Sequence, residues 1–198
     1  EDLVREKIQE ISDAQLSTII ALANLAESRD DATGCHIGRT QDFCRAIAEQ
    51  LRKNSPYGDV ITDGFINNLY FSAPLHDIGK VGIRDNILLK PGTLTSEEFE
   101  IMKTHVMIGV KTLESIRGRF SDNEFLNIGI ALTRSHHEKW NGKGYPDGLV
   151  GEEIPLCARI MAISDVYDAL RSQRPYKQAF SHETSCGIIY ELSGSHFD

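Results

Sequence analysis

The chain of 198 residues is long enough to bury a hydrophobic core, and 40% hydrophobic with 25% charged residues is ordinary for a soluble globular protein. The net charge of -8 argues against binding to nucleic-acid polymers or anionic membranes, which gain affinity by neutralising phosphates with Lys and Arg, although a local basic pocket remains compatible with it. We expect a cytoplasmic protein without membrane contact, because no run reaches transmembrane length and the four dispersed cysteines are typical of reduced thiols.

The first part of the chain predicts three helices. Apolar residues at three- to four-residue spacing indicate one long amphipathic helix from about residue 3 to 28. After a break at Thr33-Gly34, a second helix is predicted over 37–51, and a third from Phe65 to about Leu75 delivers a His-Asp pair at its end.

The rest of the chain predicts further helices around a loop. Residues 79–93 are expected to be irregular, and a capping box at Thr95 predicts a helix that runs to residue 105, followed by another over 106–116. A helix capped near residues 121–124 should end at residue 137, and 154–170 should be helical again. The glycine-rich stretch from residue 140 to 151 predicts an ordered loop or lid. Because no segment alternates with a period of two, we predict an all-α protein with a single domain.

Two doublets of metal-binding side chains, His76-Asp77 and His136-His137, are the main chemical signal. Imidazole and carboxylate suit zinc, iron, nickel and manganese. One doublet alone would more readily be a helix end with a solvated acid and a capping His. The combination with His36, His105 and Asp165 instead predicts a polynuclear metal site built from side chains that project inward from several helices.

Several ordered motifs resemble the HD-GYP domain, a branch of the HD phosphohydrolase superfamily, from about Leu22 to the end of the chain. They are the segments 27–30, 33–36, 76–80, 102–105, 144–146 and 165–170. The resemblance implies a single helical HD-type domain with a GYP lid loop at Gly144-Tyr145-Pro146. It also implies hydrolysis of cyclic di-GMP, a bacterial second messenger, to pGpG or on to GMP.

The resemblance assigns the metal ligands position by position. One ion would be held by His36, His76, Asp77 and Asp165, and a second by His105, His136 and His137, with Asp77 bridging the two. Asp77 and Lys80 would be the catalytic residues. Two adjacent ions can activate water and stabilise charge on the attacking and leaving oxygens of a phosphodiester. We expect a dinuclear centre of iron or manganese, with zinc and nickel as alternatives.

The resemblance also implies residues that contact the substrate: Asp30, Lys80, Tyr145, Asp168, Arg174 and Lys177. Four of them have a simpler alternative role. The lysine could be a surface residue, the tyrosine could pack the turn, and the two aspartates could cap or orient neighbours. Glu138, beside the second doublet, is expected to support a ligand imidazole.

One departure from the family concerns the number of ions. Relatives with a third metal carry Glu four residues before the first ligand His, and here that position is Ala32, whose methyl group cannot bind a cation. The site is therefore expected to be dinuclear, the alternative being that Asp31 reaches in through a shifted backbone.

The long first helix, residues 1–28, resembles the linker that joins a sensory or receiver domain to the catalytic domain, here residues 29–198. This organisation implies upstream signal input, a homodimer through the helix, and signalling partners such as diguanylate cyclases, although an amphipathic helix can also simply pack on its own domain. Two alternatives to the phosphodiesterase remain: a hydrolase of another phosphorylated nucleotide, and a module that senses the dinucleotide or docks a partner with weak or lost catalysis.

Overall fold

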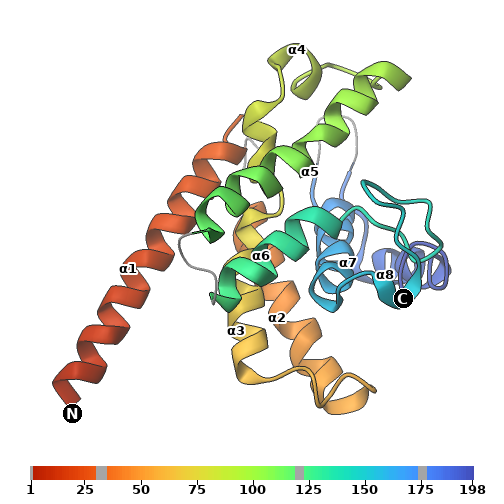
Figure 1. The fold of residues 1–198 in the computed structure, drawn as a ribbon. Coiled ribbons are helices and arrows are strands. Elements are labelled where there is room, and N and C mark those ends of the chain that lie inside the picture. The colour runs from red at the N-terminus through yellow and green to blue at the C-terminus, as the bar shows by residue number, and fades with distance from the viewer. Residues whose placement is uncertain (1, 30–34, 119–122, 174–177) are drawn as a thin grey trace.

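The protein is described by a computed structural model that covers residues 2–29, 35–118, 123–173 and 178–198 (Figure 1). Within these residues there is no strand, only the isolated bridges Asn141–Val150 and Ser193–Phe197. The prediction of an all-α fold is confirmed. The helices are α1 (Asp2–Glu27), α2 (His36–Asn54), α3 (Asp63–Ser72), η1 (Ala73–Leu75), η2 (Ile78–Gly82), α4 (Asp85–Leu88), α5 (Ser96–Arg117), α6 (Glu124–Ser135), η3 (Gly151–Glu153), α7 (Leu156–Arg171) and α8 (His182–Glu191).

The main hydrophobic core lies between α2, α3, α6 and α7. Its fully buried members include Ile61, Leu69, Leu132, Ile160 and Met161. Capping side chains fix where the surrounding helices begin: the side chains of Thr62, Thr95 and Asn123 accept hydrogen bonds from main-chain N–H groups in the first turns of α3, α5 and α6. These caps satisfy main-chain donors that the first turn of each helix would otherwise leave unpaired.

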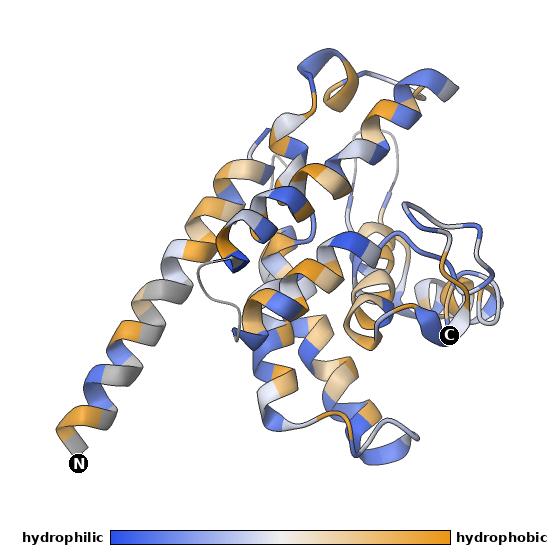
Figure 2. Cartoon of the chain, in the orientation of Figure 1, coloured by the Kyte–Doolittle hydropathy of each residue, from blue (hydrophilic) through white to orange (hydrophobic). Residues whose placement is uncertain are grey.

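Helix α1 extends away from the remaining helices at its N-terminal end (Figure 1). Hydrophobic and hydrophilic residues alternate along it in Figure 2, as predicted for an amphipathic helix. Leu3, Val4 and Ile11 are exposed, whereas Ala23 and Ala26 in the last two turns are buried. The C-terminal end of α1, which contacts η1 and η2, is thus the part that belongs to the domain core.

Three expectations about helix boundaries were wrong. Residues 96–117 form the single helix α5 and not two helices, residues 79–93 contain η2 and α4, and α8 was not predicted. Gly109 lies on the buried face of α5, at the point where the helix approaches η2 closely. A Cβ on Gly79 would lie 1.9 Å from the carbonyl oxygen of His105, so both glycines serve packing between two backbones.

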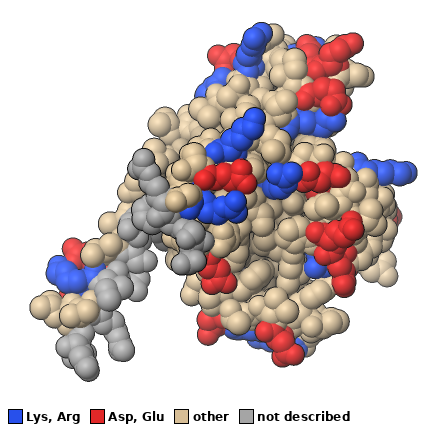
Figure 3. Space-filling model, viewed as in Figure 1, with Lys and Arg blue, Asp and Glu red and all other residues tan. Residues whose placement is uncertain are grey.

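Positive and negative side chains are interspersed over the face shown in Figure 3, without an extended basic surface. Among the described residues, no helix is long and apolar enough to cross a membrane.

Candidate metal centre

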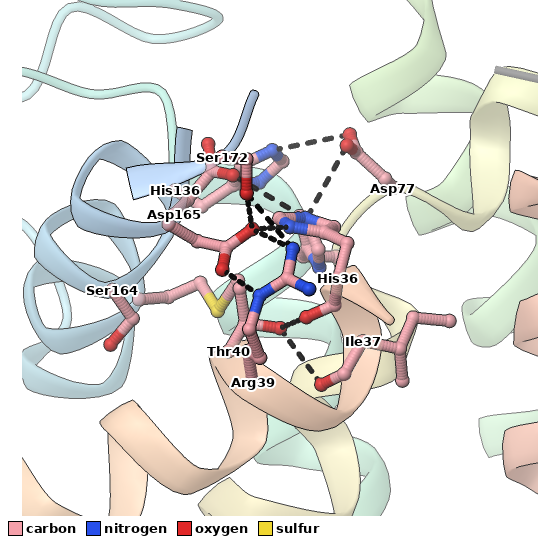
Figure 4. A network of polar contacts seen from close by, with 12 residues as sticks. His36, Ile37, Arg39, Thr40, Asp77, His136, Ser164, Asp165 and Ser172 are labelled. Atoms are coloured by element: carbon pink, nitrogen blue, oxygen red, sulfur yellow. Dashed lines mark hydrogen bonds and ion pairs between the residues drawn. The ribbon is translucent and has the colours of Figure 1, made fainter. Parts of the chain in front are cut away.

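Asp77 lies at the centre of the predicted ligands. It follows the short helix η1, whose tight turn at Pro74 redirects the chain after α3 and buries both His76 and Asp77. The Oδ1 atom of Asp77 lies 3.1 Å from His105 Nε2 and 3.6 Å from His136 Nε2. Its Oδ2 atom lies 3.3 Å from His76 Nε2 (Figure 4 shows Asp77 facing His136). The two carboxylate oxygens therefore face different histidines, the arrangement required of a bridging ligand.

The first group of potential metal ligands comprises Asp77, His105, His136 and His137. One ligand atom from each residue lies within 4.8 Å of the others. His105 projects from the middle of α5, and the two adjacent histidines follow directly after the last residue of α6. Three imidazoles and a carboxylate converging in a buried site form a donor set that suits a divalent transition metal.

The second group comprises Glu27, His36 and His76, whose ligand atoms also lie within 4.8 Å of one another. Asp165 of α7 lies beside it, with Oδ1 3.5 Å from His36 Nε2. Figure 4 shows His36 and Asp165 pointing toward one another from α2 and α7. Burial raises the pKa of Glu27, against the opposing attraction of the two histidines.

The histidine rings are oriented by hydrogen bonds on the side away from the site. The Nδ1 atoms of His76, His105 and His136 face main-chain carbonyl oxygens at 2.7 to 3.0 Å, which places the ring proton there. Their Nε2 atoms are buried without a hydrogen-bond partner, as is Asp77 Oδ1. Buried polar atoms are nearly always paired, so four unpaired atoms facing one space fit bound cations well.

The charges of the site are strongly coupled. Burial lowers the pKa of His136 and holds that of His137 well below its usual range, which favours neutral imidazoles. Burial also opposes charge on Asp77 and His76. For Asp77, Lys80 and His76 outweigh that effect and hold the pKa well below its usual range. For His76, the carboxylates of Asp77 and Asp165 outweigh it and raise the pKa to about 9. An ion binding here at neutral pH therefore has to displace a proton.

Asp168 supports His36 from behind. Its Oδ2 lies 2.7 Å from His36 Nδ1, and both of its oxygens accept hydrogen bonds from the Arg39 guanidinium, at 2.5 and 3.0 Å. Burial would raise the pKa of Asp168, but these bonds outweigh it and lower the pKa to about 2. Asp168 thus occupies His36 Nδ1 and leaves Nε2, which faces Asp165, as the nitrogen that can bind a metal.

The loop from residue 140 to 151 covers one side of the first group. Tyr145 stacks on His137 with ring centroids 4.7 Å apart. Glu138 was expected to support a ligand imidazole, but its carboxylate instead accepts hydrogen bonds from the main-chain N–H groups of residues 147–149, at 2.7 to 3.1 Å. A Cβ on Gly144 would lie 2.4 Å from the Cα of Glu138, so the loop folds tightly over that residue.

The structure brings the predicted ligands into these two adjacent groups and places Lys80 Nζ 2.9 Å from Asp77 Oδ2. Asp30, Asp31, Ala32, Arg174 and Lys177 lie outside the described residues. Sequence reasoning missed Glu27 as a member of the site. The available signal was its position one turn after Ala23, on the apolar face of α1.

Comparisons with known proteins agree with this geometry. Residues 20–198 match the HD domain family. A cyclic di-GMP phosphodiesterase of Vibrio cholerae is 53% identical over 180 residues, covering 91% of this chain and 37% of the relative. A probable cyclic di-GMP phosphodiesterase of the same organism is 47% identical over 190 residues, covering 96% and 43%. The chain thus spans less than half the length of these relatives.

A crystal structure of a cyclic GMP-AMP specific phosphodiesterase from Vibrio cholerae has the same fold. It aligns with a TM-score of 0.61 at 21% identity, covering 91% of this chain and 45% of that one.

Proposed function

The chain belongs to the HD domain family, and from that membership we propose that it is a metal-dependent phosphodiesterase that hydrolyses cyclic di-GMP to pGpG or GMP in bacterial signalling. The observation that carries this proposal is the buried Asp77 carboxylate between two histidine groups, with ligand nitrogens that have no other partner. The names of two relatives that are 53% and 47% identical to this chain support cyclic di-GMP as the substrate.

Two bound divalent ions would supply Lewis-acid chemistry at a phosphodiester. His36, His76 and Asp165 would hold one ion, and His105, His136 and His137 the other, with Asp77 shared between them. We propose iron or manganese, with zinc and nickel as alternatives, because imidazole and carboxylate donors accept all four metals.

We propose that Lys80 and Tyr145 act on the substrate. The Lys80 ammonium group lies beside Asp77 and is partly exposed, so it can offer positive charge to a phosphate oxygen at the edge of the site. Tyr145 packs over a proposed ligand imidazole and shields that side of the site from water. Asp168, in contrast, acts on His36, which favours an orienting role over direct substrate contact.

The experiment is turnover of cyclic di-GMP by protein loaded anaerobically with iron or manganese, with products separated by chromatography. We expect conversion to pGpG or GMP that is abolished by a chelator. Parallel reactions with 3'3'-cyclic GMP-AMP test the alternative substrate named for the structural relative. Metal-loaded protein that binds cyclic di-GMP without any turnover would contradict the enzyme and favour the sensing module.

We further propose that α1 mediates contact with a second copy of the chain. Val4, Ile11, Leu22 and Leu25 on this helix are exposed. Replacing Ile11 with Glu should lower the molar mass measured by light scattering from dimer to monomer. A monomeric parent protein would contradict this proposal.

A further inference from the structure

We propose that Glu27 is a ligand of the ion held by His36 and His76, so that the last turn of α1 completes the metal centre. A ligand atom of Glu27 lies within 4.8 Å of one from each histidine, although the carboxylate comes from a different helix. This inference rests on the proposed function only in requiring that the two histidines bind an ion.

Among the described residues, no hydrogen bond accounts for the burial of the Glu27 side chain. The residue is 6% exposed, and its Oε1 atom is enclosed by protein without a hydrogen-bond partner. A buried carboxylate without a partner is costly unless a cation or a donor compensates for it. The Nε2 atom of His76 is in the same cluster and also lacks a hydrogen-bond partner, so two buried polar atoms there remain unsatisfied by the protein itself.

Contacts made by residues before and after Glu27 hold it in this position. Ala23 and Ala26, in the turn before it, are buried in the domain. Two residues after it, the Arg29 guanidinium donates hydrogen bonds to the carbonyl oxygens of Val81 and Ile83, at 2.8 and 3.0 Å, and pairs with Asp85. These contacts join the end of α1 to the segment that follows Asp77, so the position of the Glu27 carboxylate relative to the two histidines is fixed.

The additional carboxylate gives the two ions different surroundings. The group around His36 and His76 gains an oxygen donor beside Asp165, whereas the group of His105, His136 and His137 is dominated by imidazole nitrogen. Harder oxygen donors favour manganese and ferrous iron over softer ions. We therefore expect the two positions to differ in affinity, and only one of them to depend on α1.

The test compares Mn²⁺ binding by the parent protein, Glu27→Gln and the control Glu6→Gln, an exposed glutamate on the same helix. Glutamine keeps the shape of the side chain and an acceptor oxygen but removes the charge. We expect about two ions per chain in the parent and in the control. We expect about one in Glu27→Gln, with affinity for the lost ion reduced at least about 10-fold by calorimetry.

Thermal unfolding with and without Mn²⁺ separates a ligand from a structural residue. In the chelator-treated protein, removing a buried charge that has an oxygen without a hydrogen-bond partner should leave the melting temperature unchanged or higher. The increase produced by Mn²⁺ should be smaller in Glu27→Gln than in the parent. Equal stoichiometry and affinity in Glu27→Gln and parent would overturn the inference, as would loss of helical circular dichroism in the metal-free variant. A parent that binds no ion would overturn the proposed function as well.

Discussion

Replacing Asp168 with Asn tests the physical account of the support behind His36. The variant keeps the shape of the side chain but loses the charge that faces His36 and Arg39. The pKa of Asp168 is lowered from 3.8 to about 2, a difference that corresponds to about 2 kcal/mol of stability at neutral pH. Because solvent screens the half-exposed Arg39, we expect a loss of about 1 to 2 kcal/mol in the free energy of unfolding.

The assay is urea unfolding of chelator-treated parent, Asp168→Asn and the exposed control Asp59→Asn at several pH values. A carboxyl group with a lowered pKa stabilises the fold above its unfolded-state pKa near 4, and this contribution disappears as the pH falls toward 2. The difference between Asp168→Asn and parent should therefore be full at pH 7 and shrink below pH 4. Equal stability at pH 7, or a difference that stays constant down to pH 3, would refute the reasoning.

Three further predictions concern the site. Lys80→Ala should lower cyclic di-GMP turnover with metal content unchanged, because an ammonium group has no lone pair for a cation; reduced metal content would contradict this role. Mn²⁺ affinity should increase from pH 6 to about 9, because His76, with its pKa raised to about 9, is protonated in the metal-free protein and must release a proton when the ion binds. Calorimetry in buffers of different ionisation enthalpy measures the number of protons released. An affinity that does not change with pH would contradict the account. Glu138→Gln keeps one acceptor oxygen but replaces the other with a donor NH2 group, so at least one loop N–H group loses its acceptor. We expect the free energy of unfolding to fall by about 1 to 3 kcal/mol and kcat/KM to decrease while the metals stay bound. Parent-like kinetics and stability would show that the loop does not depend on this carboxylate.

Much of the site could be predicted because its residues stand in short, recognisable motifs at helix ends. The His76-Asp77 and His136-His137 doublets were predicted as ligands from their chemistry, and the structure brings the two doublets together at Asp77. Glu27 stands in the motif at residues 27–30 but was given no role, since a glutamate at the end of an amphipathic helix is usually solvated. Only the docking of α1 against η1 and η2 removes it from water.

The fold was predictable in the order of its main helices, but less so where tertiary packing decides. Residues 96–117 were predicted as two helices, and no local preference accounts for Gly109 inside the single helix α5, because glycine lowers helix propensity. The structure explains it by the close approach of Gly79 to the same helix. Propensity is a local property, whereas this contact joins residues about 30 positions apart in the sequence.

The most direct test of the central claim is the metal content and the cyclic di-GMP turnover of Asp77→Ala beside the parent, after identical anaerobic loading. Asp77 faces both histidine groups, so its loss should lower the occupancy of both ions and abolish hydrolysis. The account predicts a folded variant, with parent-like circular dichroism, that holds fewer ions and produces no pGpG or GMP. Full metal occupancy with parent-like turnover in this variant would contradict the account.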